Sequence, residues 1–170
     1  MSKYYYLVSS LPYLRLQREL PVTTDFFLAE CKKWLTLEDM KVLLSAEVHC
    51  QEGRCEDTPV LKEWKEFDLD LRKRLAEIRE TKKSGEEARA NELLKSALDQ
   101  PTPLLKERAL AKIRLDFIDD RSISFFFDIN WLVLYFLKLQ ILERLAKFDK
   151  DKGEEIFYKL CEVVYEQAER

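Results

Sequence analysis

The chain has 170 residues, of which 46% are hydrophobic and 36% are charged, and its formal net charge is -3 at pH 7. This composition is too hydrophobic for a disordered chain, and its interleaved acidic and basic residues do not form the basic stripe that binds nucleic acids. Only three glycines and five prolines are present, which leaves little material for turns. We therefore expect one all-α domain over residues 1–170, a compact bundle of about seven helices, with no nucleic-acid partner.

The first part of the chain is predicted to be extended and then helical. The segment "KYYYLVSSLPYLRL" (3–16) is interrupted by Pro12, which favours an extended stretch laid across helices. Thr24 or Asp25 is expected to cap a first helix, and Thr36 is expected to cap a second one, "TLEDMKVLLSAEV". The side chains predicted to form the apolar stripes of these two helices are Phe27, Cys31, Trp34, Leu37, Met40, Leu44 and Val48.

The clearest amphipathic helix is predicted to begin at Thr58-Pro59, because a hydroxyl cap followed by proline at the first helical position is a favourable start. It should end near Lys83, where Ser84-Gly85 forms a turn into a helix at about 86–99. Apolar residues recur every three or four positions in the longer helix: Leu61, Trp64, Phe67, Leu71, Leu75 and Ile78. The shorter helix carries Leu93, Leu94, Ala97 and Leu98.

The same start signal recurs at Thr102-Pro103, for a helix that should reach about Ile118. Asp128 is expected to cap the last long helix, about 129–148, which is apolar on most sides through Leu137 and so belongs at the centre of the fold. A final helix over 154–168 is also expected to face inward. The side chains predicted to be buried by the first and last of these helices are Leu105, Ala109, Ile113, Phe117, Phe157, Leu160 and Val164.

Export and membrane insertion are not expected from the sequence. The N-terminus lacks a basic region followed by a clean apolar block, so it does not resemble a signal peptide. The longest uncharged piece of the most hydrophobic run is Ile129–Leu137, far shorter than the ~20 residues that span a bilayer.

An internal echo raises the question of repeated units. The stretch "LKLQILERLAKFDKDKGEE" (137–155) resembles "LDLRKRLAEIRETKKSGEE" (69–87), since both place Arg-Leu-Ala within an amphipathic helix and end in Gly-Glu-Glu. Two interpretations stay open: two diverged copies of one helical unit, or two unrelated helices that end in similar turns. The first would divide the domain into sub-units at 1–57, 58–100 and 101–170.

Catalytic and metal-binding patterns are scarce. His49, Cys50 and Cys55 lie close together in "HCQEGRC", but no second Cys/His pair completes a tetrahedral zinc site. The three glycines are isolated and cannot form a loop that cradles phosphates. The aspartate pairs have spacings typical of solvated turns and helix ends rather than of one helical face: Asp68/Asp70, Asp119/Asp120 and Asp149/Asp151. We therefore predict no catalytic, cofactor or metal site and no small-molecule substrate.

Three stretches resemble a bacterial family of unknown function whose genes lie among those of V-type ATP synthases. They are "YYYLVSSLP", "WKEFDLDLRKRLAEIR" and, most specifically, "DINWLVLYFLKLQILERLAKFDKDKG" (128–153). The resemblance spans nearly the whole chain. It implies a genomic context but no reaction, because the family has no settled activity.

A weaker resemblance is to the C-type central-stalk component of V-type ATPases, which is built from repeated helical units. Its helix pattern is similar to the series Glu66, Leu71, Arg72, Arg79, Lys83, Gly85, Glu86 and Glu87. The chain departs from the pattern where Asp70 replaces the asparagine before Leu-Arg, and it is shorter than a C-type component with three units. In the echo, Leu142 and Asp149 stand in place of Arg72 and Arg79.

These resemblances imply a non-enzymatic, cytoplasmic subunit or accessory protein of a V-type ATPase, peripheral at the inner face of the membrane. Its partners would be the rotor ring and the central stalk, which it would couple mechanically. The candidate partner-binding residues are Arg72, Arg79, Trp131 and Tyr135. One alternative is a transient assembly factor of the same ATPase. A second is a small helical enzyme or metal-dependent hydrolase that uses His49, Cys50, Cys55 or the aspartate pairs.

Overall fold

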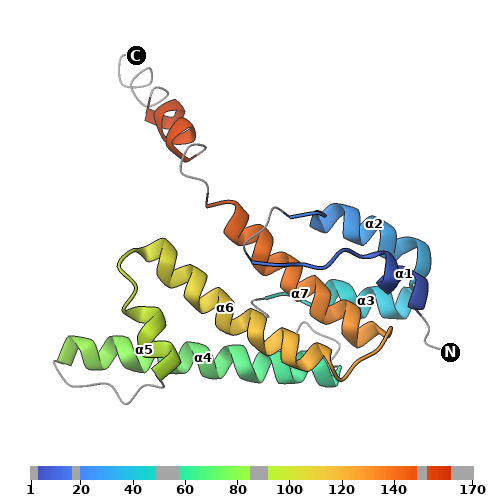
Figure 1. The fold of residues 1–170 in the computed structure, drawn as a ribbon, viewed down its shortest axis with the longest axis horizontal. Helices are drawn as coiled ribbons and strands as arrows, with labels where there is room; N and C mark the ends of the chain where they lie inside the picture. The colour runs from blue at the N-terminus through green and yellow to red at the C-terminus, as the bar shows by residue number, and fades with distance from the viewer. Residues whose placement is uncertain (1–3, 17–19, 49–57, 85–91, 149–152, 162–170) are drawn as a thin grey trace.

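The computed structural model describes residues 4–16, 20–48, 58–84, 92–148 and 153–161. The regular structure of these residues is helical and includes no strand, which confirms the all-α fold class. The helices labelled in Figure 1 are α1 (Tyr5–Ser10), α2 (Thr24–Trp34), α3 (Leu37–Ser45), α4 (Pro59–Ser84), α5 (Glu92–Leu98), α6 (Pro103–Ser122) and α7 (Ile129–Ala146). Residues 153–161 form a further helix.

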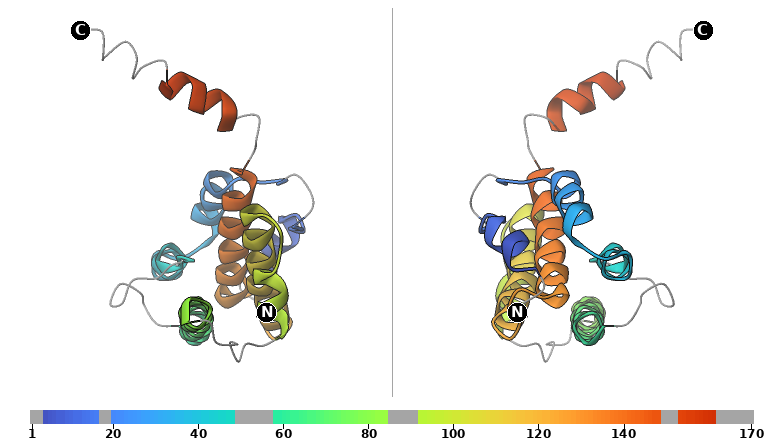
Figure 2. Two further views of the ribbon diagram at one scale, coloured as in Figure 1. Left: turned by 90° about the vertical axis from the view of Figure 1, so that its left-hand side faces the viewer. Right: turned by 90° about the vertical axis from the view of Figure 1, so that its right-hand side faces the viewer.

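Helix α7 lies at the centre of the fold, as its apolar surface predicted. It contacts α2, α3, α4 and α6, and the side views in Figure 2 show it among these helices. Asp128 caps its start, because the Asp128 carboxylate accepts a hydrogen bond of 2.9 Å from the Trp131 backbone N–H. A helix that is apolar on all sides must be covered on all sides. Its buried residues run without a break from Leu132 to Leu139 and include Ile141 and Leu142.

Helix α4 joins two hydrophobic clusters. Its first half packs Val60, Leu61 and Trp64 into the main core, which is built around α7. Its second half forms a smaller cluster with α5 and α6. The predicted stripe of α4 is confirmed, since all its members are buried or packed against a cluster. The smaller cluster consists of Leu71, Leu75, Ile78, Leu94, Ala97 and Leu110.

Helix α6 has two packed faces, so the single predicted stripe was incomplete. Leu105, which the sequence predicted to be buried, is exposed. The other residues of the predicted stripe, Ala109, Ile113 and Phe117, are only partly buried. The buried residues of α6 are instead Leu110, Ala111, Leu115 and Ile118. α6 contacts both α7 and α5, so the two faces share its apolar residues. The helix also continues through "DDRS" to Ser122, beyond the expected end.

The N-terminal segment is partly helical, which corrects the expectation of an extended strand-like stretch. Residues 5–10 form α1, and residues 12–15 lack regular structure. The Tyr4 backbone N–H donates a hydrogen bond of 3.1 Å to the carbonyl oxygen of Phe127, which ties the start of α1 to the connection before α7. Phe127 itself has a positive φ of 55°. The Tyr5 ring also packs against the Phe127 ring, with centroids 4.8 Å apart, and the sequence pattern does not reveal these long-range contacts.

The predicted stripes of α2 and α3 are wrong at three positions. Phe27 and Cys31 are buried as expected, but Trp34 is exposed. In α3, Leu37 and Leu44 are exposed, and the buried residue is Leu43 instead. Both helices are short and touch α7 along narrow faces, so a shift of one residue changes which side chain is covered. The predicted cap of α3 is confirmed, because Thr36 caps this helix. The cap of α2 was predicted at Thr24 or Asp25, but it is the preceding residue, Thr23.

The helix at 153–161 does not face inward, contrary to the sequence-based expectation. Phe157 and Leu160 are each 62% exposed, and Val164 lies outside the described residues. Figures 1 and 2 show this helix apart from the labelled ones. Periodicity shows which face of a helix is apolar, but not whether the same chain covers that face.

The two echoing segments have different surroundings. α4 exposes one face over its whole length, whereas α7 is enclosed. The helix after α4 buries Leu94 and Ala97, whereas the helix after α7 is exposed from residue 153 to residue 160. The packing of the first segment is therefore not repeated in the second.

Two leucines test whether α7 and the helix at 153–161 differ in their contribution to stability. Leu137→Ala should lower the free energy of unfolding by about 3 kcal/mol, because a fully buried side chain leaves a cavity. The matched control Leu160→Ala should change it by less than about 0.5 kcal/mol, because this side chain is mostly in water. Urea denaturation followed by circular dichroism measures both. A large loss for Leu160→Ala would show that the helix at 153–161 docks on the core.

Candidate functional site

Two polar side chains of α7 form hydrogen bonds that hold α2 and α3 against it. The Glu143 carboxylate accepts hydrogen bonds from the backbone N–H and the hydroxyl of Thr24, at 2.5 and 2.7 Å, at the start of α2. The Gln140 amide donates to the Ala46 carbonyl oxygen at 2.8 Å and accepts from the Val48 N–H at 3.2 Å, at the end of α3. These hydrogen bonds give Glu143 and Gln140 a structural role in holding α2 and α3 against α7.

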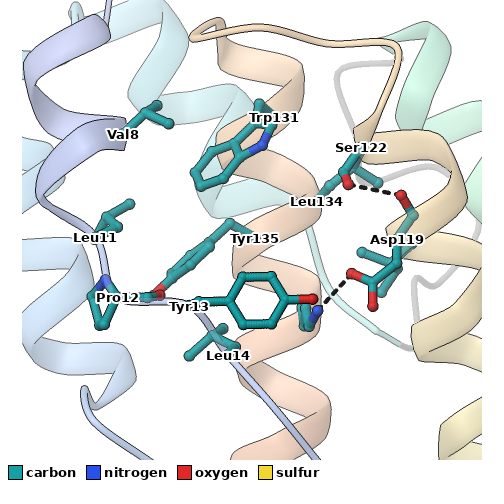
Figure 3. A pocket seen from close by; sticks show the side chains of 12 residues that line it. Val8, Leu11, Pro12, Tyr13, Leu14, Asp119, Ser122, Trp131, Leu134 and Tyr135 are labelled. Atoms are coloured by element: carbon teal, nitrogen blue, oxygen red, sulfur yellow. Dashed lines mark hydrogen bonds and ion pairs between the residues drawn. The ribbon is translucent and has the colours of Figure 1, made fainter.

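A cavity of about 190 Å³ opens between the N-terminal segment, α6 and α7 (Figure 3). Its walls are mainly apolar and aromatic, and Figure 3 shows the rings of Trp131 and Tyr135 as its back wall. The two rings are stacked, with centroids 5.3 Å apart. Further apolar walls come from Val8, Leu11, Pro12, Leu14, Ile118 and Leu134, and Tyr13 adds another ring.

One charged pair, Lys138 and Asp119, lines this mainly apolar cavity. The Lys138 ammonium is 2.5 Å from a carboxylate oxygen of Asp119 and 5.0 Å from the centre of the Tyr13 ring. Lys138 is only 7% exposed, whereas the Asp119 side chain is 46% exposed. A buried ammonium is costly unless it is paired, and a ring face adds a further attraction. The positive charge is therefore fixed by the fold, while its carboxylate partner reaches into water.

The structure places two of the predicted partner-binding residues, Trp131 and Tyr135, side by side in this cavity. Tyr135 is buried and donates a hydrogen bond of 2.9 Å to the Pro12 carbonyl oxygen, which holds the N-terminal segment against α7. Burial raises the pKa of Tyr135 to about 12, with a smaller contribution from Cys31. Tyr135 is thus a core residue that keeps its proton, and Trp131 is half-buried. Their predicted role as partner contacts stays a prediction.

The other two predicted residues, Arg72 and Arg79, lie on the exposed side of α4, far along the chain from the cavity residues. Arg72 forms an ion pair with Asp68, one turn earlier in the helix. Asp68 is buried and also accepts a hydrogen bond of 2.9 Å from the Arg114 guanidinium, which links α4 to α6. Arg72 therefore has a structural partner of its own, and Arg79 is exposed.

Of the residues considered for metal chemistry, His49, Cys50 and Cys55 lie outside the described part of the chain. Within that part, the Cys, Asp and Glu residues form no group of three that could hold a metal ion. Burial raises the pKa of the Cys31 thiol to about 12, so this thiol stays protonated near neutral pH. None of the described helices is long and apolar enough to cross a membrane.

Sequence reasoning missed the pair Lys138 and Asp119. A signal was present, because Lys138 stands between Leu137 and Leu139 inside the most apolar helix of the chain. A charge inside such a run must be paired when it is buried, and this requirement points to a partner. The identity of the partner could not be found, since Asp119 comes from another helix, 19 residues away along the chain.

Residues 86–167 match the model of a family described as "Protein of unknown function (DUF2764)". This match confirms the predicted resemblance to an uncharacterised family over the part of the chain that contains α5, α6, α7 and the helix at 153–161. No curated protein matches the chain, and no solved structure matches it.

Substitutions at Asp68 and Arg72 distinguish the two ion pairs of Asp68, one with Arg114 and one with Arg72. Asp68→Ala should lower the free energy of unfolding by about 3 kcal/mol, because it leaves the Arg114 guanidinium buried and unpaired. Arg72→Ala should cost less than about 1 kcal/mol, because Arg72 is 44% exposed and Asp68 keeps Arg114. Urea denaturation of both variants measures the difference. Equal losses would contradict the assignment of Arg114 as the main partner of Asp68.

The buried thiol predicts a reactivity pattern. At mildly alkaline pH, Cys31 should resist iodoacetamide in the folded protein, because its raised pKa and its burial suppress the thiolate. Cys161, which is partly exposed, should be modified under the same conditions. Peptide mass spectrometry resolves the two sites. Cys31 should become reactive in urea, and rapid modification of Cys31 in the folded protein would be the contrary result.

Proposed function

We propose that the chain is a non-enzymatic subunit or accessory protein of a V-type ATPase, on the cytoplasmic side of the membrane. Its role would resemble that of the C-type central-stalk component, which couples the rotor ring to the shaft. The proposal is supported by the sequence resemblances at Leu71-Arg72 and at 128–153, and by the architecture of the described residues.

The observation that carries the proposal is the helix at 153–161. Its apolar residues Ile156, Phe157 and Leu160 are 58 to 62% exposed. Lys159 and Glu155 form an ion pair of 2.6 Å, as solvated helix surfaces commonly do. An amphipathic helix that leaves its apolar side in water has the form that binds by laying that side into a groove of another protein. Such a helix suits a component of a larger assembly.

The enclosed centre of the fold supports a mechanical role. Close-packed interiors have low compressibility and transmit strain, so a body built around α7 can pass a force from one surface to another. The side chains that tie α2 and α3 to α7 add directional links between the elements. Coupling of this kind requires shape and stiffness and does not require a reacting group.

Purification of the native ATPase from the source cells tests the proposal. A stable subunit should be present at a fixed stoichiometry in the mature complex, as measured by native mass spectrometry. The chain would be an assembly factor if it were found only in partial assemblies. Its absence from both would overturn the proposal.

A double substitution tests the part played by the helix at 153–161. Phe157→Asp combined with Leu160→Asp should remove the chain from the complex and leave its stability unchanged, because both side chains are exposed in the isolated fold. Leu37→Asp is the matched control, since Leu37 is 85% exposed on α3, and this variant should still assemble. Co-purification and thermal denaturation are the two measurements. Normal assembly of the double variant would show that another surface carries the interaction.

A further inference from the structure

We propose that the cavity in Figure 3 is a binding site for a small organic monocarboxylate with an aromatic or branched apolar body. The proposal does not depend on the V-type ATPase role. It also departs from the sequence-based expectation that the chain meets no small molecule. The argument rests on the size of the cavity, the nature of its walls and the unequal burial of one charged pair.

The size and the walls of the cavity fit the apolar part of such a ligand. A cavity of about 150 Å³ is enough to bind benzene, so about 190 Å³ can hold one ring with a short side chain. The stacked rings of Trp131 and Tyr135 offer a flat wall, and Leu11 and Leu134 offer aliphatic surface. Ligand sites commonly combine mainly apolar walls with a few fixed polar groups.

Lys138 supplies the fixed polar group, and its charge selects an anion. Its ammonium has three N–H donors, and among the described residues it contacts a carboxylate oxygen of Asp119 and the ring face of Tyr13. Because Lys138 is more than nine-tenths buried, it has little access to water as a further hydrogen-bond partner. A ligand carboxylate at the Lys138 end of the cavity would form a charge-assisted hydrogen bond in a partly desolvated setting.

Asp119 occupies the position that a ligand carboxylate would take. It is the half-exposed member of the pair, so it can turn into water at low cost, whereas Lys138 cannot leave the cavity. We therefore assign Asp119 as a resident competitor for the ligand. Binding exchanges one carboxylate for another on the same ammonium, and no bond to either is covalent. This exchange predicts that neutralising Asp119 strengthens binding, which a purely structural ion pair would not do.

The test uses 3-phenylpropionate as the probe and 3-phenylpropionamide as its uncharged control of similar shape. Isothermal titration calorimetry on the full chain should show the carboxylate binding about tenfold more tightly than the amide, because a charged acceptor forms the stronger hydrogen bond. Asp119→Asn should tighten binding of the carboxylate by about fivefold through loss of the competitor. Lys138→Met, which keeps the length of the apolar stem, should bring the ratio between the two probes to about one.

Fluorescence locates the binding event. Trp131 lines the cavity, so the probe should change the tryptophan emission of the original chain and leave that of Trp131→Phe unchanged, while calorimetry still detects binding. Circular dichroism checks that each variant is folded. If Lys138→Met does not fold, two measurements still test the proposal: the affinity of Asp119→Asn for 3-phenylpropionate, and the ratio of acid to amide binding in the original chain. Equal binding of acid and amide, weaker binding to Asp119→Asn, or no binding at millimolar concentration would each overturn the proposal.

Discussion

Helix α7 is enclosed by α2, α3, α4 and α6, so every polar side chain that it carries inward must find a partner inside the molecule. Three such side chains meet this constraint in different directions. Glu143 holds the start of α2, Gln140 holds the end of α3, and Lys138 reaches Asp119 on α6. Apolar burial alone would tolerate small rotations of α7 about its axis. Because the Glu143 and Gln140 contacts each require their own angle, together they fix one orientation of α7 relative to α2 and α3.

The long helices were predictable because their signals are local and redundant. α4 has a Thr-Pro start and an apolar stripe that continues for five turns, and α7 has a capping aspartate and an apolar surface on every side. The errors occur where tertiary contacts decide. Leu43 rather than Leu44 is buried in α3 because of where that short helix meets α7, and α6 divides its apolar residues between two neighbours. The residue before α1, Tyr4, is hydrogen-bonded to Phe127, more than a hundred residues away, and no local pattern predicts such a contact.

The candidate site was only half visible in the sequence. Trp131 and Tyr135, predicted as partner contacts, lie side by side, because positions four apart share one face of a helix. The sequence did not reveal that the Tyr135 hydroxyl donates a hydrogen bond to the Pro12 carbonyl oxygen and so holds the N-terminal segment. The charged part of the site joins α7 to α6, and Tyr13 reaches it from a stretch without regular structure. Contacts between distant segments of this kind follow from topology, which spacing along the chain does not encode.

The cavity lies at the boundary between the helices α6 and α7 and the irregular segment that covers them after α1. On one side stand α6 and α7, which share an extensive interface, and on the other stands the segment after α1, held by the Tyr135–Pro12 hydrogen bond and by apolar contacts such as those of Leu14. A close-packed centre leaves few voids, whereas an irregular segment laid over it leaves gaps where its side chains do not interdigitate. Such a boundary is where a small molecule can be accommodated without repacking the core. The fold thus keeps the centre around α7 closed and places the cavity and the exposed helix at 153–161 at its edges.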